Sequence, residues 1–333
     1  MNILVTGSEG YLGSYLVNYF RKKKYNIYGV DLYQNSNAVY NYYNFDISVE
    51  RNYQVLKKIK FDLVIHAAAK LPIEKDNKKM NDVNIEGTKH LINFLEKFNS
   101  NCKLIFISTN AMYSSNYDYK VKESTDKTII DNYGKTKLIA ENMIIKSSLN
   151  YSILRSPIII SKYRAGVISI AYDLISQDKK IPLLNRGINT FDAIEINDLS
   201  DAIYLLFKKD VRNIYNVSCD QVLSFRDIFQ YIIVKSSSKS TFINLPRIKL
   251  AFVFKLLFFL RLSPIGPYHL AGLVSNFKFD NSKLKKMGWV PKNNIKETFY
   301  ESYKYYISNE FSQRSTSSKS QKKGIIKLLN YFL

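Results

Sequence analysis

In the first half of the chain, short apolar runs alternate with longer segments in which apolar residues recur at helical spacing. Strands are expected at Ile3–Val5, Ile27–Val30, 61–69, 103–109 and 151–155. Helices are expected at Tyr11–Lys24, Val83–Phe98 and Asn132–Lys146. Nearly continuous apolar strands separated by helices are typical of a parallel sheet that is covered on both faces. The pattern therefore predicts an α/β architecture for this half.

The second half of the chain is less regular. Helical spacing is found at Ile168–Gln177, Leu199–Phe207 and Phe225–Val234, between short extended runs. We expect a sheet unit over residues 1–160 and mainly a smaller lobe over residues 161–311, with segments that return to the sheet. Residues 312–333 begin with a polar, basic stretch and are expected to form a flexible tail.

Composition excludes some classes of protein. The formal charge is +21 and 46% of the 333 residues are hydrophobic, but the lysines are scattered rather than gathered on one element. A nucleic-acid-binding protein usually concentrates its basic residues, so no nucleic-acid partner is expected. Two distant cysteines and three unclustered histidines predict neither disulfides nor a metal site. With a strand starting at residue 2 and no signal-peptide pattern before it, we expect a cytoplasmic protein.

Three glycines follow the first expected strand in the spacing G-x-x-G-x-x-G, at Gly7, Gly10 and Gly13. Glycine lets the backbone approach a pyrophosphate closely, and the helix that follows offers free N–H groups and the positive end of its dipole. Asp31 ends the second strand, where a carboxylate accepts hydrogen bonds from the adenosine ribose hydroxyls. A carboxylate would repel a 2′-phosphate, so the pattern predicts NAD rather than NADP.

A second motif places Tyr133 and Lys137 four residues apart on one face of an expected helix. A tyrosine titrates near pH 10, too high for a base at neutral pH. A neighbouring ammonium and a cationic nicotinamide would both favour the phenolate and lower the pKa of the tyrosine. The glycine turn and this pair together predict a dehydrogenase-type site.

These motifs resemble the extended short-chain dehydrogenases/reductases, specifically the NAD-dependent epimerase/dehydratase group. The resemblance spans almost the whole chain. It rests on TGSEGYLG (6–13), Asp31, FDIS (45–48), HAAA (66–69), VNIEGT (83–88), ISTNAMY (107–113), YGKTK (133–137), LRSP (154–157), INDLSDAI (196–203), YNVS (215–218) and DNSKLKKMGWVP (280–291). It implies an α/β fold with a Rossmann-type doubly wound parallel sheet and a smaller C-terminal substrate-binding lobe, and a homodimer.

The resemblance also implies roles for individual residues. Thr109 would hydrogen-bond the reacting sugar oxygen, Tyr133 would accept and donate its proton, and Lys137 would hold the nicotinamide ribose. Asn84 would order the site. The residues expected to bind NAD are Gly7, Gly10, Tyr11, Leu12, Gly13, Asp31, Asp46, Ile47, Ala67, Ala68, Ala69, Tyr133, Lys137, Pro157 and Ile158.

Departures from the family pattern narrow the reaction. In 4,6-dehydratases an Asp-Glu pair follows the catalytic threonine, whereas Asn110 and Ala111 stand here. Epimerases that act beside a ketone need an additional Cys and His, and no histidine follows Arg155 in its segment. The prediction is therefore a sugar 4-epimerase, with a 4-ketosugar reductase as the alternative. A non-catalytic NAD-binding regulator is a third reading, which the retained Thr, Tyr and Lys disfavour.

Substrate recognition departs from the pattern as well. Phe191 stands where nucleotide-sugar epimerases usually have an arginine, and HLAGLVS (269–275) lacks a second one; Arg155, Arg164 or Arg186 could replace them. The apolar stretch 247–264 is too short and too charged to span a bilayer. It is read either as a buried lobe helix or as a helix that contacts the inner face of the membrane, aided by the apolar, basic C-terminus. A sugar linked to polyprenyl diphosphate is therefore considered beside a nucleotide sugar.

Overall fold

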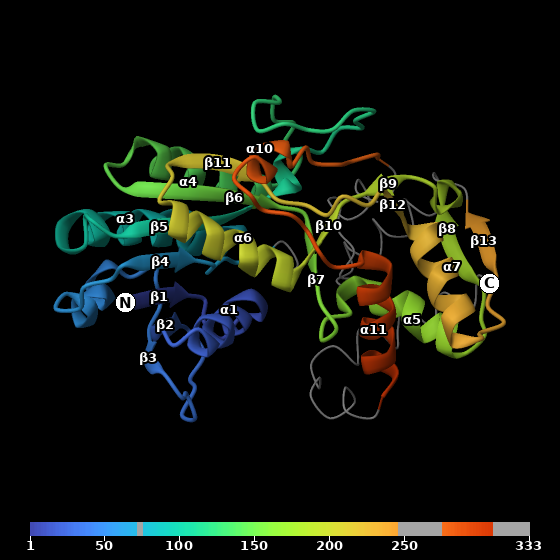
Figure 1. Cartoon of the computed structure of the whole chain (residues 1–333), viewed down its shortest axis with the longest axis horizontal. Coiled ribbons are helices and arrows are strands. Elements are labelled where there is room, and N and C mark those ends of the chain that lie inside the picture. The colour runs from blue at the N-terminus through green and yellow to red at the C-terminus, as the bar shows by residue number, and fades with distance from the viewer. Residues whose placement is uncertain (72–75, 246–274, 309–333) are drawn as a thin grey trace.

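The computed structural model describes residues 1–71, 76–245 and 275–308. Its largest element is a seven-stranded, fully parallel sheet in the order β11-β6-β5-β4-β1-β2-β3 (Figure 1). The strands are β1 (Asn2–Thr6), β2 (Asn26–Asp31), β3 (Asn41–Asn44), β4 (Leu63–His66), β5 (Lys103–Thr109), β6 (Asn150–Ser156) and β11 (Asn213–Asn216). The chain order reverses between β1 and β4, which is the place where doubly wound sheets bind ligands at the carboxyl ends of their strands. The predicted Rossmann-type fold is confirmed.

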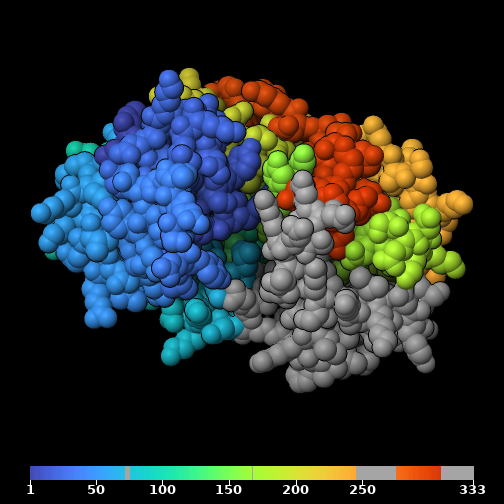
Figure 2. Space-filling model, turned by 90° about the horizontal axis from the view of Figure 1, so that it is seen from below, coloured from blue at the N-terminus to red at the C-terminus, as the bar shows by residue number. Residues whose placement is uncertain are grey.

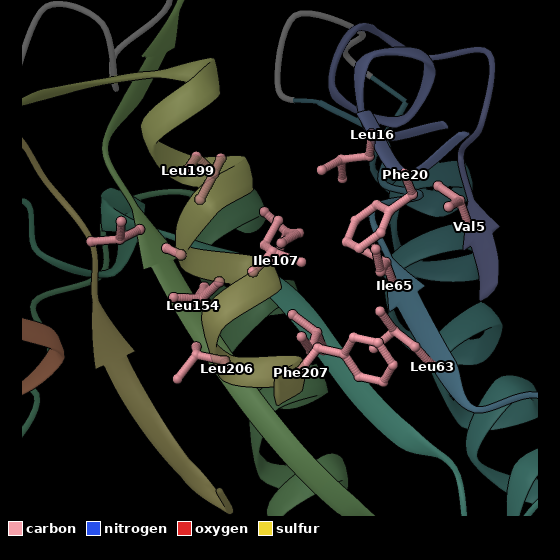
Figure 3. Close-up of a cluster of buried hydrophobic side chains, with 14 of the residues drawn as sticks. Val5, Leu16, Phe20, Leu63, Ile65, Ile107, Leu154, Leu199, Leu206 and Phe207 are labelled. Carbon is pink, nitrogen blue, oxygen red and sulfur yellow. The ribbon is translucent and has the colours of Figure 1, made fainter. Parts of the chain in front are cut away.

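Helices cover both faces of the sheet because successive strand residues point to opposite sides. On one face, α1 (Tyr11–Lys22) and α6 (Ile196–Lys209) bury a cluster that includes Leu16, Phe20 and Leu206 (Figure 3). On the other face lie η1 (Glu50–Leu56), α3 (Gly87–Phe98) and α4 (Asn132–Lys146). Ile3 and Val5 belong to the first cluster and Leu4 to the second, so the middle of β1 is apolar on both faces.

Several predicted elements appear with the expected bounds, and some differ. The strand at 103–109 and the helix at Asn132–Lys146 are confirmed residue for residue. The strand predicted over 61–69 is shorter. β4 covers only Leu63–His66, and the three alanines that follow it lie outside the strand. The helix predicted from Val83 begins as a wide turn, η2 (Asp82–Glu86), which follows α2 (Asn77–Asn81) and leads into α3.

The smaller lobe is built from short paired strands and helices around a separate core. Its strands pair as β7 (Ile158–Ile160) with β10 (Ala193–Glu195), β8 (Ile181–Leu184) with β13 (Phe242–Leu245), and β9 (Thr190–Phe191) with β12 (Leu223–Ser224). Its helices are η4 (Gly166–Ile168), α5 (Ser169–Ser176), η5 (Asn185–Gly187), α7 (Phe225–Ser236) and α11 (Ile295–Ile307). Figure 2 shows this lobe beside the sheet unit. Its core gathers residues such as Tyr172, Ile232 and Phe299.

Two elements from beyond residue 160 return to the sheet. β11 pairs with β6 at the sheet edge, and α6 supplies much of the cluster shown in Figure 3. The short helix α10 (Ser282–Lys285) contacts β11 and adds Leu284 to the same cluster.

The apolar stretch 247–264 and the C-terminal tail 312–333 lie outside the described residues, so the readings given for them above stay predictions. Within the described ranges, no helix has the length and apolar character needed to cross a bilayer.

Candidate functional site

The glycine turn between β1 and α1 is built from backbone packed against backbone. Gly7 has φ +73°, and a Cβ there would lie 2.8 Å from the backbone of Ala68. A Cβ on Gly13 would lie 1.9 Å from the carbonyl oxygen of Gly7, so the first turn of α1 packs directly on the loop. No side chain caps the start of α1 and no acidic residue lies in its first turn. A phosphate group fits these features, because helix N–H groups and the dipole favour an anion there.

Asp31 lies at the carboxyl end of β2, one strand away from the glycine turn. Its carboxylate is 9% exposed and accepts the backbone N–H groups of Glu9 at 2.9 Å and Tyr33 at 3.2 Å. The segment that follows, residues 32–37, contains no Lys or Arg to receive a 2′-phosphate. These residues fit the adenosine ribose of NAD.

The other residues expected along the cofactor lie on neighbouring elements. The Asp46 carboxylate accepts the backbone N–H and the hydroxyl of Ser48, and Ile47 is buried against Gly87. Ala67, Ala68 and Ala69 follow β4, where the Ala68 N–H donates to the Thr6 hydroxyl at 3.3 Å. Pro157 is buried after β6, while Ile158 begins β7 with an exposed side chain.

Tyr133 and Thr109 meet at the carboxyl edge of the sheet. Thr109 ends β5, and Tyr133 lies in the first turn of α4, whose start Asp131 caps by accepting the Gly134 N–H at 2.8 Å. Burial and, to a lesser extent, the Asp131 charge raise the pKa of Tyr133 to about 12. The hydrogen bond with Thr109 and the charge of Arg164 lower the pKa of Tyr133.

Lys137 lies one turn further along α4 and is 3% exposed. Its ammonium lies 3.9 Å from the centroid of the Phe106 ring. Burial lowers the pKa of Lys137 to about 7, although the nearby Glu141 carboxylate opposes that shift. The lowering effect expected of Lys137 on the tyrosine pKa stays a prediction, since the cation acting on Tyr133 in the structure is Arg164.

Asn84, on the wide turn η2, hydrogen-bonds to helix α4. Its side chain accepts the Lys70 N–H at 2.7 Å and donates to the Lys70 carbonyl at 3.1 Å and to the Thr136 hydroxyl at 3.0 Å. Asn84 therefore connects the segment after β4 to the residue before Lys137. The ordering role expected of Asn84 stays a prediction.

Sequence reasoning missed a buried ion pair beneath the site. Arg155, 2% exposed, donates from Nη2 to Glu141 Oε2 at 2.7 Å and from Nε to Glu141 Oε1 at 3.0 Å. It also donates to the Tyr113 hydroxyl at 2.7 Å, and the Ser108 hydroxyl donates to Glu141. The suggestion that Arg155 binds the substrate phosphates is therefore wrong, because these partners hold its guanidinium. No spacing in the sequence signals this pair, because β6 and α4 bring the two residues together only in the fold.

Phe191 occupies the place of the expected arginine as a core residue. It is 4% exposed and stacks on Phe225, with ring centroids 4.2 Å apart and planes 11° from parallel. Arg186 is exposed on η5, in a turn where Asn185, Arg186 and Gly187 all have positive φ. Arg164 is half-buried and lies over the ring of Tyr11.

His66 ends β4, and its side chain is buried and hydrogen-bonded on both ring nitrogens. Its ring nitrogens pair with the Thr6 hydroxyl at 2.7 Å and the Thr88 hydroxyl at 3.0 Å. Burial lowers the pKa of His66 to about 3, so the imidazole is neutral at physiological pH. Among the described residues, no three His, Cys, Asp or Glu side chains are grouped as metal ligands.

The fold and this site define a dinucleotide-binding α/β protein with Thr109, Tyr133 and Lys137 at the carboxyl edge of its sheet, at the end of β5 and on α4. The model of the NAD dependent epimerase/dehydratase family matches residues 3–218, and the chain belongs to that family. NAD is its cofactor. The residues at the glycine turn and at Asp31 fit that group, as described above.

Individual relatives are distant. A UDP-glucose 4-epimerase of Lactobacillus helveticus is 25% identical over 350 residues, covering 93% of this chain and 98% of that protein. A dTDP-D-glucose 4,6-dehydratase of Dictyostelium discoideum is 26% identical over 269 residues, covering 69% of this chain and 61% of that protein. A crystal structure of a Thermus thermophilus UDP-glucose 4-epimerase in complex with NAD superimposes with a TM-score of 0.75 at 17% identity, covering 92% and 99% of the two chains. The homologues are thus sugar epimerases and dehydratases.

Proposed function

We propose that this protein is an NAD-dependent 4-epimerase of a sugar carried on a diphosphate, acting through a transient 4-keto sugar. The observation that carries the proposal is the contact between Thr109 and Tyr133 at the carboxyl edge of the sheet, one helical turn from Lys137. Asn110 and Ala111 follow Thr109, so the chain offers no acid there for the elimination of water. Epimerisation needs only the three groups that are present.

Each of the three residues has a distinct task in this proposal. Tyr133 accepts the proton of the sugar 4-hydroxyl and returns a proton to the oxygen after the ketone has turned over in the pocket. Thr109 holds that oxygen by a hydrogen bond, and Lys137 binds the nicotinamide ribose and favours the tyrosinate. Bound NAD supplies the hydride acceptor and donor for this chemistry.

The carrier of the sugar is either a nucleoside diphosphate or polyprenyl diphosphate. The similarity to UDP-glucose 4-epimerases favours the nucleotide. The burial of Phe191 against Phe225 favours another carrier, because the usual diphosphate arginine is replaced by a core aromatic. We propose a role in surface polysaccharide synthesis as a homodimer in the cytoplasm, with contact to the inner face of the membrane if the carrier is a lipid.

A 4-ketosugar reductase is the alternative, since it uses the same Thr, Tyr and Lys. The two activities differ in stoichiometry. An epimerase regenerates its cofactor and turns over with no added reductant, whereas a reductase consumes one NADH or NADPH for each sugar.

The test is to identify the copurified cofactor by mass spectrometry and to screen nucleotide and polyprenyl-diphosphate sugars for isomerisation. With the substrate in hand, Tyr133→Phe is expected to lower kcat about 10²- to 10⁴-fold and to leave NAD bound. Tyr231→Phe, which removes a hydroxyl that donates to Glu297 on the lobe surface, is the matched control. Full activity of Tyr133→Phe would overturn the assignment, and net consumption of NADH would favour the reductase.

A further inference from the structure

The turn that carries Arg164 is fastened to both parts of the molecule. The Tyr11 hydroxyl, at the start of α1, donates to the Ser161 hydroxyl at 2.7 Å. The Arg164 N–H donates to the Ser161 carbonyl at 3.2 Å, and the Ser302 hydroxyl of α11 donates to the Arg164 carbonyl at 2.9 Å. The backbone of Arg164 is therefore held near the start of α1, which follows the glycine turn.

The guanidinium group of Arg164 has no acidic partner among the described residues. Its central carbon lies 4.3 Å from the centroid of the Tyr11 ring, and its side chain is half-buried. Within the described part of the chain, no carboxylate lies within 4 Å of it and no side-chain hydrogen bond is made. Burial accordingly lowers the pKa of Arg164, and the titratable groups that interact with it are the phenols of Tyr11 and Tyr133. Arg155, which is buried on β6, differs from Arg164 because it forms an ion pair with Glu141.

Withdrawing a cation from water without a partner is costly, and a guanidinium carries five N–H donors in a planar fork. Such a fork matches the paired oxygens of a phosphate group. Tyr11 follows the turn where the NAD pyrophosphate fits, and Tyr133 marks the place of the reacting sugar. Arg164 lies over the Tyr11 ring and acts electrostatically on Tyr133, so it is placed to meet a diphosphate bound beside the start of α1.

We propose that Arg164 binds a diphosphate between the start of α1 and Tyr133. The diphosphate belongs either to NAD or to the carrier of the sugar, and the second source rests on the function proposed above. In the second case, Arg164 binds the carrier diphosphate, which Phe191 cannot do because it lacks a charged group. Arg164 follows β7, whereas Phe191 lies on β9.

The experiment measures two binding events by calorimetry on the full-length protein. The first is NAD binding to protein freed of cofactor, and the second is the binding of inorganic pyrophosphate and of UDP to NAD-loaded protein. Arg164→Gln is expected to weaken at least one of them about tenfold or more, and Arg164→Lys to restore part of the loss by retaining the charge. The matched control is Arg226→Gln. Arg226 also lies over an aromatic ring, 4.9 Å from the centroid of Phe242, but it is exposed and lies on α7 of the lobe.

The outcomes separate the two sources. A loss of NAD affinity assigns Arg164 to the cofactor, and a loss of pyrophosphate and UDP affinity at unchanged NAD affinity assigns it to the sugar carrier. Unchanged NAD affinity, together with equal or undetectable binding of both probes in the wild type and the variant, overturns the proposal. Unfolding temperatures of all variants show whether a loss comes from misfolding. Neither binding measurement requires turnover. The role of Arg164 in NAD binding can therefore be decided even if the protein is not an epimerase.

Discussion

The sheet unit and the smaller lobe differ in how closely they keep the family's residues. At the carboxyl edge of the sheet, the glycine turn, Asp31, Thr109, Tyr133 and Lys137 all have the identities that the family pattern requires. In the lobe, the residue expected to be an arginine is Phe191, and it packs into the core against Phe225. The motif residues of the sheet unit are thus preserved, while the corresponding position in the lobe is altered.

This difference indicates that cofactor chemistry and substrate recognition are separable in this fold. Asp31 and the glycine turn depend on backbone geometry set by β1, β2 and α1. The lobe's recognition surface depends on short strands around a core of its own. The lobe core therefore accommodates an aromatic residue at position 191 without contact to the glycine turn or Asp31.

The largest effect is expected from breaking the ion pair beneath the site. Glu141→Ala leaves the buried Arg155 charge without its carboxylate and should lower the free energy of unfolding by about 3–5 kcal/mol. Glu301→Ala is the control, because its pair with Lys304 is exposed and its loss should change the free energy of unfolding far less. Urea denaturation measures both variants. Similar losses in the two would show that Arg155 finds another partner.

The next effect tests whether the two parts are independent. Phe191→Ala removes a stacked, buried ring and should lower the free energy of unfolding by about 3 kcal/mol, because a cavity forms in the lobe core. NAD affinity, measured by calorimetry, should be unchanged. Phe225→Ala should give the same pattern, as the ring on the other side of the stack. A loss of NAD affinity in folded Phe191→Ala protein would contradict the separation of the two parts.

A smaller effect concerns the pH dependence that Lys137 imposes on the sheet unit. The folded-state pKa of about 7 lies below the ordinary value of 10.5, so between these values unfolding takes up a proton. The free energy of unfolding of the wild type should therefore rise with pH relative to Lys137→Met, by at most about 1.4 kcal/mol per pH unit. Denaturation of cofactor-free protein at pH 7 and pH 9 measures this difference. A constant difference would mean that Lys137 stays protonated throughout.

Local patterns predicted the sheet unit well because the strongest signals there are local. The helix at Asn132–Lys146 begins at a capping aspartate, and the strand at 103–109 is buried along its whole length. β3 escaped prediction because its sequence, NYYN, carries no apolar alternation and is held by pairing with β2. The paired short strands of the lobe were missed for the same reason, since their partners lie far along the chain.

The site was predictable where a motif sets the geometry and unpredictable where side chains meet across elements. Tyr133 and Lys137 follow from helical spacing, and the glycine turn from its position after a strand. The pairing of Arg155 with Glu141 joins β6 to α4, and no spacing in the sequence distinguishes it from a phosphate-binding arginine. The unpaired state of Arg164 likewise emerges only when the elements around it are in place.

The return of α6 and β11 to the sheet has a consequence for handling this protein. A fragment that stops at residue 160 would leave the outer edge of β6 without a hydrogen-bonding strand and would uncover Ile107, Leu154 and their neighbours, which α6 shields. Exposed strand edges and uncovered apolar faces promote aggregation. Grafting a foreign recognition lobe onto this scaffold would therefore require two splice points, one on each side of the α6–β11 segment, rather than a single cut.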